Sequence, residues 1–267
     1  MDLGLQGAAA VVTGGTKGIG RATAECMASD GARVAVFARG REGLDEAVGV
    51  LRGAGSPDPI GLSVDVQDRA SVEAAFAELD DRWGELNVLV NTIGPPAGTF
   101  EELSDDDWHA TFDRGTLSAV RTVRAALPLM RKAEWARIVN VSAHSTRRQS
   151  PLIIAYTAAK SALTSLTKNL SKSLAPEGIL VNTVSPGTFV TASFTERLRP
   201  TLEARGLDPA DPQDVMTWIR DVYGQPADLG RAGRPEEIAA VITFLASRRN
   251  SYVTGADVNV DGGSDFA

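Results

Sequence analysis

The sequence predicts an α/β fold, a single doubly wound parallel sheet of seven strands with helices on both faces. Strand-like and helical runs alternate from Ala8 to Val260, and the first strand-like run leads through a glycine-rich turn into a helix. The chain of 267 residues contains no serine/glycine tract, proline-rich stretch or internal repeat that would mark a linker. Because open α/β domains reach this length without splitting, we expect residues 1–267 to form one domain.

The first unit of the chain carries the glycine-rich turn. The apolar run from Ala8 to Val12 is typical of a buried parallel strand, and a helix that ends before Gly31 follows the turn. Glycines allow close backbone approach and a helix N-terminus faces phosphate, so this context favours dinucleotide binding over an ordinary loop. The residues expected at the dinucleotide are Gly14, Thr16, Lys17, Gly18, Ile19 and Gly20.

The later strands are predicted by apolar runs that end in polar or glycine-containing segments. These runs, with the segments that end them, are Arg33–Arg39, Ile60–Val64 before Asp65 and Val66, Leu86–Val90 before Asn91–Gly94, Ile138–Ser142, Val181–Gly187, and Val258–Val260 before Asp261–Gly263. In a doubly wound sheet the ligand lies beyond the carboxyl ends of the strands, so these end segments are the candidate site.

A helix is predicted around Tyr156 and Lys160, which are four residues apart and therefore share one face. A free phenol has a pKa of roughly 10, and a neighbouring ammonium group lowers it by favouring the phenolate. A tyrosine tuned in this way exchanges a proton with a substrate oxygen. A core tyrosine beside a solvated lysine gives the same spacing, but the glycine-rich turn favours a catalytic pair.

Together these motifs resemble the short-chain dehydrogenase/reductase family, and the resemblance covers nearly the whole chain. It implies an NAD(P)-dependent oxidoreductase that interconverts a ketone and a secondary alcohol, with Tyr156 as the acid/base and Lys160 at the nicotinamide ribose. A 3-oxoacyl thioester reductase is the alternative within the family, and a cofactor-binding sensor or scaffold with impaired catalysis is the alternative outside enzymes. The resemblance further implies cofactor contacts from Asp65, Val66, Asn91, Gly94, Pro186, Gly187, Val190 and Thr191.

The end of the second strand indicates which cofactor is bound. A carboxylate there would bond the ribose 2′-hydroxyl of NAD and repel the 2′-phosphate of NADP. Where NAD-dependent relatives carry aspartate this chain has Ala38, Arg39 follows, and Lys17 lies where NADP-dependent relatives often place a cation. Because arginine binds phosphate through a planar fork, we expect NADP(H) in preference to NAD(H), although a solvated basic pair gives the same sequence.

Two positions depart from the family pattern. The family serine lies thirteen residues before the tyrosine, where this chain has Ala143. Ser142 is the favoured replacement because it completes the strand-end pattern, with Ser145 and His144 as reserve candidates, and a serine that only bonds a turn is the alternative. The family asparagine that steadies a proton-relay water is replaced by Gly115, where a bend could admit water and Thr116 could hold it.

The connection from about residue 192 to 233 breaks the regular alternation and is predicted to be a substrate lid. Its apolar and aromatic side chains favour a bulky, apolar small-molecule substrate, whereas packing at a subunit contact is the alternative. The run Pro95–Gly98 beyond Asn91 is expected to form another wall of the pocket.

Composition restricts the remaining partners. A net charge of −7 argues against nucleic-acid binding, and two histidines are too few for a metal cluster. No apolar run is long enough for a membrane span, no secretory signal is visible, and a single cysteine fits a reducing compartment, so a cytoplasmic location is expected.

The resemblance also implies a homotetramer. One candidate subunit contact is the helix Trp108–Leu129, paired with the helix that carries Tyr156. The other is the C-terminal unit, where Phe244 falls outside the apolar stripe of the helix 235–246 and Phe266 closes the chain.

Overall fold

The computed structural model describes residues 2–264 and confirms the predicted seven-stranded, all-parallel sheet. Phe266, named above as a candidate contact, lies outside the described residues. The strands are β1 (Ala9–Thr13), β2 (Arg33–Ala38), β3 (Ile60–Ser63), β4 (Val88–Asn91), β5 (Ala136–Val141), β6 (Ile179–Pro186) and β7 (Asp257–Val260). Their order in the sheet is β3-β2-β1-β4-β5-β6-β7. The direction of winding reverses between β1 and β4, and a crevice therefore opens at the carboxyl ends of these strands.

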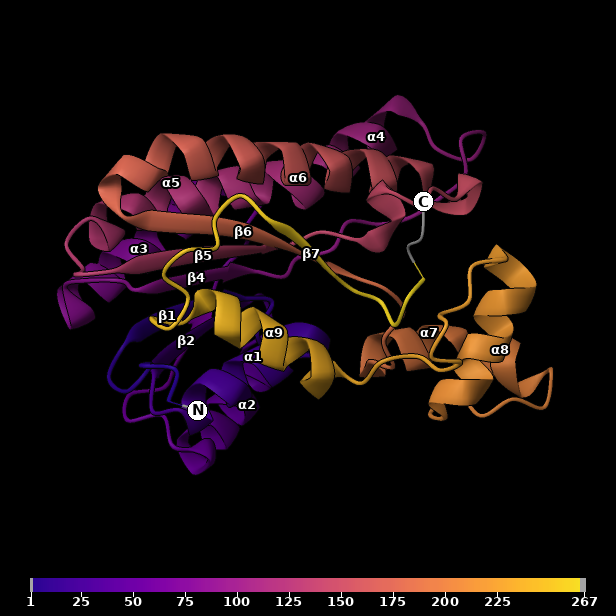
Figure 1. Cartoon of the computed structure of the whole chain (residues 1–267), viewed down its shortest axis with the longest axis horizontal. Coiled ribbons are helices and arrows are strands. Elements are labelled where there is room, and N and C mark those ends of the chain that lie inside the picture. The colour runs from indigo at the N-terminus through magenta and orange to yellow at the C-terminus, as the bar shows by residue number, and fades with distance from the viewer. Residues whose placement is uncertain (1, 265–267) are drawn as a thin grey trace.

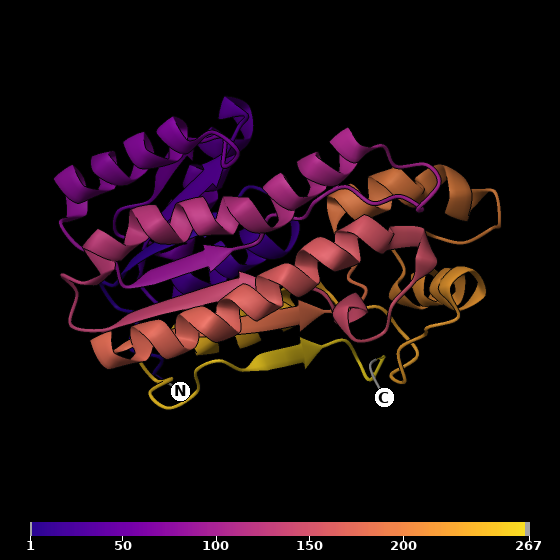
Figure 2. The ribbon, with the colours of Figure 1, turned by 90° about the horizontal axis from the view of Figure 1, so that it is seen from above.

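Helices cover both faces of the sheet, as Figures 1 and 2 show. One face carries α1 (Gly18–Ser29), α2 (Arg41–Ala54) and α9 (Pro235–Ala246). The other carries α3 (Arg69–Trp83), α5 (Ser118–Met130) and α6 (Ile154–Leu174). None of the helices within residues 2–264 is long and apolar enough to cross a membrane.

The core consists of one hydrophobic layer on each face of the sheet. Along β1, Val11 belongs to the layer under α3 and α5, whereas Val12 belongs to the layer under α1 and α9. Both side chains are fully buried, because successive residues of a strand point to opposite faces and both faces are covered. This double burial explains why the strands appear in the sequence as continuous apolar runs.

The segment 192–233 forms α7 (Ala192–Glu203) and α8 (Pro212–Tyr223), which stand beyond the end of the sheet in Figure 1. A small hydrophobic cluster of its own, which includes Leu202, Met216 and Trp218, holds the two helices together. The segment is fastened at its base by a parallel bridge between Phe189 and Gly233. It therefore packs as a distinct helical unit over the carboxyl ends of the strands.

Candidate active site

A cavity of 460 Å³ lies where β5 and β6 end, bounded on the far side by α7 and α8. Tyr156 lines it from the first turn of α6, and Ile19 joins it to the glycine turn. The rest of its wall is mainly apolar and aromatic. These residues include Pro95, Leu152, Phe189, Phe194, Leu198, Trp218, Ile219 and Tyr223.

The glycine turn has the geometry that a pyrophosphate group requires. Gly14 and Gly18 have φ values of +69° and +54°, which residues with a side chain rarely adopt. Lys17 is the N-cap of α1 but makes no side-chain capping bond, and the first turn of α1 contains no acidic residue. The first N–H groups of α1, with the positive end of the helix dipole, are therefore available to an anion. Gly20 packs so tightly that an added Cβ would lie 2.5 Å from the carbonyl oxygen of Gly14.

Lys17 and Arg39 lie at the ends of adjacent segments, and both side chains are exposed. Neither forms an ion pair with any residue in the described part of the chain, although thirteen other ion pairs are formed there. Two uncommitted cations, Lys17 in the turn after β1 and Arg39 at the end of β2, fit a ribose 2′-phosphate.

The other residues expected at the cofactor fall into two groups. Asp65, after β3, and Gly94, after β4, are exposed to solvent and can be reached by a cofactor. Val66 is buried. Asn91 is buried, and its side chain is fully engaged: Nδ2 donates to Asn140 Oδ1 (2.9 Å) and Oδ1 accepts from Thr122 Oγ1 (2.8 Å). The side chain of Asn91 therefore stabilises the ends of β4 and β5, and only its main chain remains for a cofactor.

The segment after β6 lies across the cavity from α6. Pro186, Gly187 and Thr191 line the cavity, and the Val190 N–H donates to the carbonyl of Gly233 (2.9 Å). Thr191 is the N-cap of α7, where its Oγ1 accepts from the N–H of Phe194 (3.3 Å). Its methyl group would lie 3.3 Å from a Cβ added at Gly18, so this segment and the glycine turn are in direct proximity.

Tyr156 and Lys160 occupy one face of α6, but their side chains have different environments. The Tyr156 side chain is partly buried and lines the cavity. Lys160 is 1% exposed, and its Nζ donates to the carbonyls of Val141 (2.6 Å) and Ile93 (3.0 Å) at the ends of β5 and β4. Burial lowers the pKa of Lys160 to about 7.

The expectation that Lys160 lowers the pKa of Tyr156 is wrong. Burial raises the pKa of Tyr156 to about 12, because a phenolate loses more solvation than a phenol. The charge that partly opposes this rise belongs to Arg197 of α7, and the lysine ammonium is instead bonded to main-chain carbonyls. Arg197 also lines the cavity, and the spacing of residues around Tyr156 gives no sign of it.

The two candidate serines face different ways. Ser142 is paired in the sheet, with its N–H donating to the carbonyl of Val184, and its Oγ donates to the carbonyl of Lys160 (3.0 Å) and contacts Thr164 Oγ1 (2.8 Å). It does not line the cavity, whereas Ser145 does. The Oγ of Ser145 accepts a bond from Thr157 Oγ1 (3.1 Å), which leaves its own proton for a substrate oxygen. His144 also lines the cavity, and its Nδ1 donates to the carbonyl of Pro186 (3.1 Å).

The predicted helix Trp108–Leu129 consists of three parts: α4 (Asp105–Phe112), a π-helical turn η1 (Asp113–Leu117) and α5. Gly115 lies inside the π turn and is buried. A Cβ added there would lie 2.9 Å from Pro95 Cγ and 3.0 Å from Ala159 Cβ, so the glycine permits close contact with α6. The hydroxyl of Thr116 donates to the carbonyl of Ala159 (2.8 Å) and is therefore already committed within the protein.

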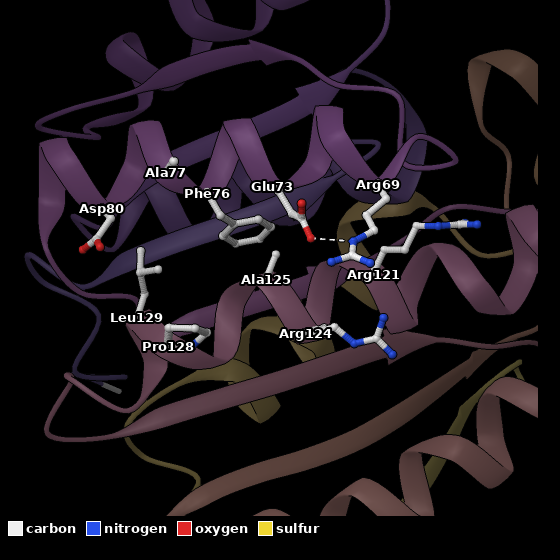
Figure 3. A pocket seen from close by; sticks show the side chains of 10 residues that line it. All are labelled: Arg69, Glu73, Phe76, Ala77, Asp80, Arg121, Arg124, Ala125, Pro128 and Leu129. Carbon is white, nitrogen blue, oxygen red and sulfur yellow. Dashed lines mark hydrogen bonds and ion pairs between the residues drawn. The ribbon is translucent and has the colours of Figure 1, made fainter.

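Figure 3 shows a second hollow, between α3 and α5, with the 10 side chains that line it. Phe76 and Leu129 give it an apolar floor, and charges of both signs surround it, with Arg69 paired to Glu73 (2.6 Å). None of these side chains lines the cavity around Tyr156.

Within residues 2–264, no group of three or more His, Cys, Asp or Glu side chains could hold a metal ion. The cavity around Tyr156 is therefore the candidate active site.

Comparisons with known proteins agree with this geometry. A family model described as enoyl-(acyl carrier protein) reductase matches residues 14–265. A 3β-hydroxysteroid dehydrogenase of Mediterraneibacter gnavus is 35% identical over 259 residues, which cover 95% of this chain and 93% of that protein. A 3-oxoacyl-(acyl-carrier-protein) reductase, FabG of Thermotoga maritima, is 33% identical over 261 residues, covering 97% and 98%. The structure of L-sorbose reductase from Gluconobacter frateurii, complexed with NADPH and L-sorbose, is 29% identical with a TM-score of 0.91 and matches 99% of this chain and 98% of that chain.

This chain belongs to the short-chain dehydrogenase/reductase family and is an NAD(P)-dependent oxidoreductase.

Proposed function

We propose that the protein reduces a ketone to a secondary alcohol with NADPH as the hydride donor. The observation that carries this proposal is the joint presence of Tyr156 and Ser145 in one largely apolar cavity, which Ile19 and Thr191 connect to the glycine turn. The pair of uncommitted cations, Lys17 and Arg39, supports NADP(H) as the cofactor. The NADPH-bound sorbose reductase provides further support from a relative.

The roles of the protein groups follow from their hydrogen bonds. When bound, the cofactor supplies the hydride. We propose that Ser145 donates its free proton to the carbonyl oxygen of the substrate and so holds the carbonyl beside Tyr156. Tyr156, protonated at neutral pH, then transfers its proton to the same oxygen. Lys160, buried at the ends of β4 and β5, is proposed to bind the nicotinamide ribose.

The wall of the cavity favours a substrate with an apolar body, because aromatic and aliphatic side chains from α7 and α8 supply most of it. A 3-oxoacyl thioester is the second candidate, since it combines a ketone with an acyl chain and several relatives carry that reductase activity in their names. The cofactor-binding sensor is disfavoured, because Tyr156 and a serine hydroxyl remain together in an accessible cavity. Turnover of a panel of aliphatic, aromatic and 3-oxoacyl ketones with NADPH tests the proposal, and no turnover on any of them would contradict it.

The environments of Ser142 and Ser145 predict which of the two hydroxyls is needed for catalysis. Ser145→Ala is expected to lower kcat about tenfold or more, the scale of one lost orienting hydrogen bond to the reacting oxygen. Ser142→Ala is expected to act mainly on stability, because its hydroxyl bonds Lys160 and Thr164 within the protein. This reverses the order favoured by the sequence. Steady-state kinetics and melting temperatures of both variants test this prediction. A larger loss of kcat in Ser142→Ala than in Ser145→Ala would show that Ser142 is the catalytic serine, as the sequence favoured.

The cofactor preference is expected to be at least tenfold in favour of NADPH over NADH, which corresponds to about 1.4 kcal/mol. Arg39→Ala is expected to remove much of this preference by weakening NADPH binding and leaving NADH binding nearly unchanged. Titration of both cofactors by fluorescence measures the four dissociation constants. Arg52→Ala, on the far end of α2, is a matched control that removes a cation without touching the end of β2. Equal affinities for the two cofactors in the unmodified protein would refute the assignment.

A homotetramer and a cytoplasmic location stay predictions. Phe244 is 38% exposed and Tyr252 is 97% exposed, so the C-terminal unit offers apolar surface to a second copy. Light scattering is expected to give about four times the chain mass of 28.1 kDa, and a mass of 28.1 kDa at micromolar concentration would exclude the tetramer.

A further inference from the structure

The cavity around Tyr156 has an uneven charge distribution. Among residues 2–264, Arg197 and His144 are the lining residues with basic side chains, and no aspartate or glutamate of that range lines the cavity. Arg197 is exposed as well as lining the cavity, so it stands at the mouth, with its guanidinium carbon 5.9 Å from the ring centroid of Phe194. An arginine held against an aromatic face keeps its N–H edge free for a planar anion.

No partner within residues 2–264 neutralises Arg197. It forms no ion pair or hydrogen bond there, whereas two other arginines of the same segment are paired: Arg199 with Glu203 (3.1 Å) and Arg205 with Asp221 (3.8 Å). On α7 the residues three and four positions away from Arg197 are Ser, Phe, Pro and Thr, so the helix itself offers no acid. The charge is therefore presented to the cavity without a counter-ion from the described residues.

The influence of this charge extends to the reaction centre. Arg197 is the charged group that opposes the rise in the pKa of Tyr156, and both side chains line the same cavity. An anion at Arg197 would thus lie in the same cavity as the reacting carbonyl.

Resting on the proposed function, we infer that the preferred substrate is an oxo acid: a ketone with a hydrocarbon body and a carboxylate that pairs with Arg197. One planar guanidinium matches one carboxylate in charge and in bidentate geometry. A phosphate dianion would leave a negative charge uncompensated beside Tyr156, because Arg197 is the one permanently charged cation among the described lining residues. Apolar side chains, among them Leu198 and Trp218, would contact the hydrocarbon between the two polar ends.

Pairs of substrates that differ only in charge test the inference. Oxo acids of several chain lengths and their methyl esters share the carbonyl and the hydrocarbon, so the ratio of their kcat/KM values isolates the carboxylate. We expect the unmodified protein to prefer the acid by about tenfold or more at the best chain length. Arg197→Met keeps an apolar side chain of similar length and is expected to bring the ratio close to one. Because the ratio is taken within each variant, any effect of Arg197 on Tyr156 cancels.

Arg199→Met is the matched control, since Arg199 lies on the same helix, is paired with Glu203 and does not line the cavity. It is expected to retain the full preference for the acid. Equal kcat/KM values for acid and ester in the unmodified protein at every length, or a preference that survives in Arg197→Met, would overturn the inference. Melting temperatures of both variants verify that they are folded.

Failure of the proposed function gives a different result. Reduction of the esters without preference for the acids would reject the carboxylate site and leave the reductase intact. No reduction of either series would reject the reductase, and the site would then be tested by binding alone. In that case a saturated carboxylic acid is expected to raise the melting temperature of the unmodified protein more than its methyl ester does, and Arg197→Met to abolish the difference. The absence of a difference in the unmodified protein would reject the site as well.

Discussion

Tyr156→Phe is expected to lower kcat for ketone reduction by about 10²–10⁴-fold, the usual contribution of a positioned proton donor. The substitution removes only the hydroxyl, and the ring continues to line the cavity at the start of α6. Binding of NADPH is therefore expected to stay within about threefold of that of the unmodified protein. Steady-state kinetics and a cofactor titration measure the two effects. An unchanged kcat would show that another group supplies the proton.

The rate of alcohol oxidation should depend on pH through the same residue. Burial raises the pKa of Tyr156 to about 12, so the phenol is protonated at neutral pH and ready for ketone reduction. Oxidation of the alcohol needs the phenolate instead, and the phenolate fraction grows about tenfold per pH unit below the pKa. The rate of alcohol oxidation is therefore expected to rise from pH 7 to pH 10, and a flat profile would contradict Tyr156 as the base. In Tyr156→Phe this rise should disappear from any residual oxidation.

Gly115→Asn is expected to destabilise the protein by about 1–3 kcal/mol and not to increase activity, although it restores the residue type of the family. The added Cβ alone would lie 2.9 Å from Pro95 Cγ and 3.0 Å from Ala159 Cβ, closer than normal contact. Ala159 is carried by α6 next to Lys160, so relief of the clash requires α6 or the π turn to shift. Such a shift is expected to lower kcat as well. Gly115→Ala should show a smaller loss of stability through the same contact.

A matched control for this prediction is Gly49→Ala in the exposed middle of α2, where an added Cβ meets nothing within 4 Å. It is expected to raise stability by roughly 0.4–1 kcal/mol, because alanine favours the helix and has fewer unfolded conformations than glycine. Thermal melting at equal protein concentration compares the three variants. A Gly115→Asn protein with unchanged melting temperature and higher kcat would show that the site accepts the asparagine.

The sequence by itself predicted the sheet and the location of the site. Apolar runs such as Ala8–Val12 correspond to buried strands because helices cover both faces of a parallel sheet, and this pattern is local. The turn at Gly14–Gly20 and the pair Tyr156 and Lys160 are local as well, since a few consecutive residues fix their geometry. The strand order then brings these local motifs to one edge, as every strand is parallel to its neighbours.

The tertiary structure decided which side chain of a local motif reaches the cavity. Ser142 and Ser145 are three residues apart at the end of β5, and only their contacts with Thr164 and Thr157 on α6 distinguish the committed hydroxyl from the available one. The contact of Gly115 with Pro95 and α6 likewise joins segments that are far apart in the sequence.

The tertiary structure also determined the pKa values of the titratable groups in the site. The spacing of Tyr156 and Lys160 places them on one face of a helix, yet Lys160 bonds the carbonyls of Ile93 and Val141, so burial dominates both pKa values. The charge that lowers the pKa of Tyr156 belongs to Arg197, which lies 41 positions further along the chain. It reaches the site because α7 packs over the ends of the strands. Neighbouring residues determine the periodicity of helices and strands. The solvation of a side chain and its ion pairs depend instead on the distant segments that the fold places beside it.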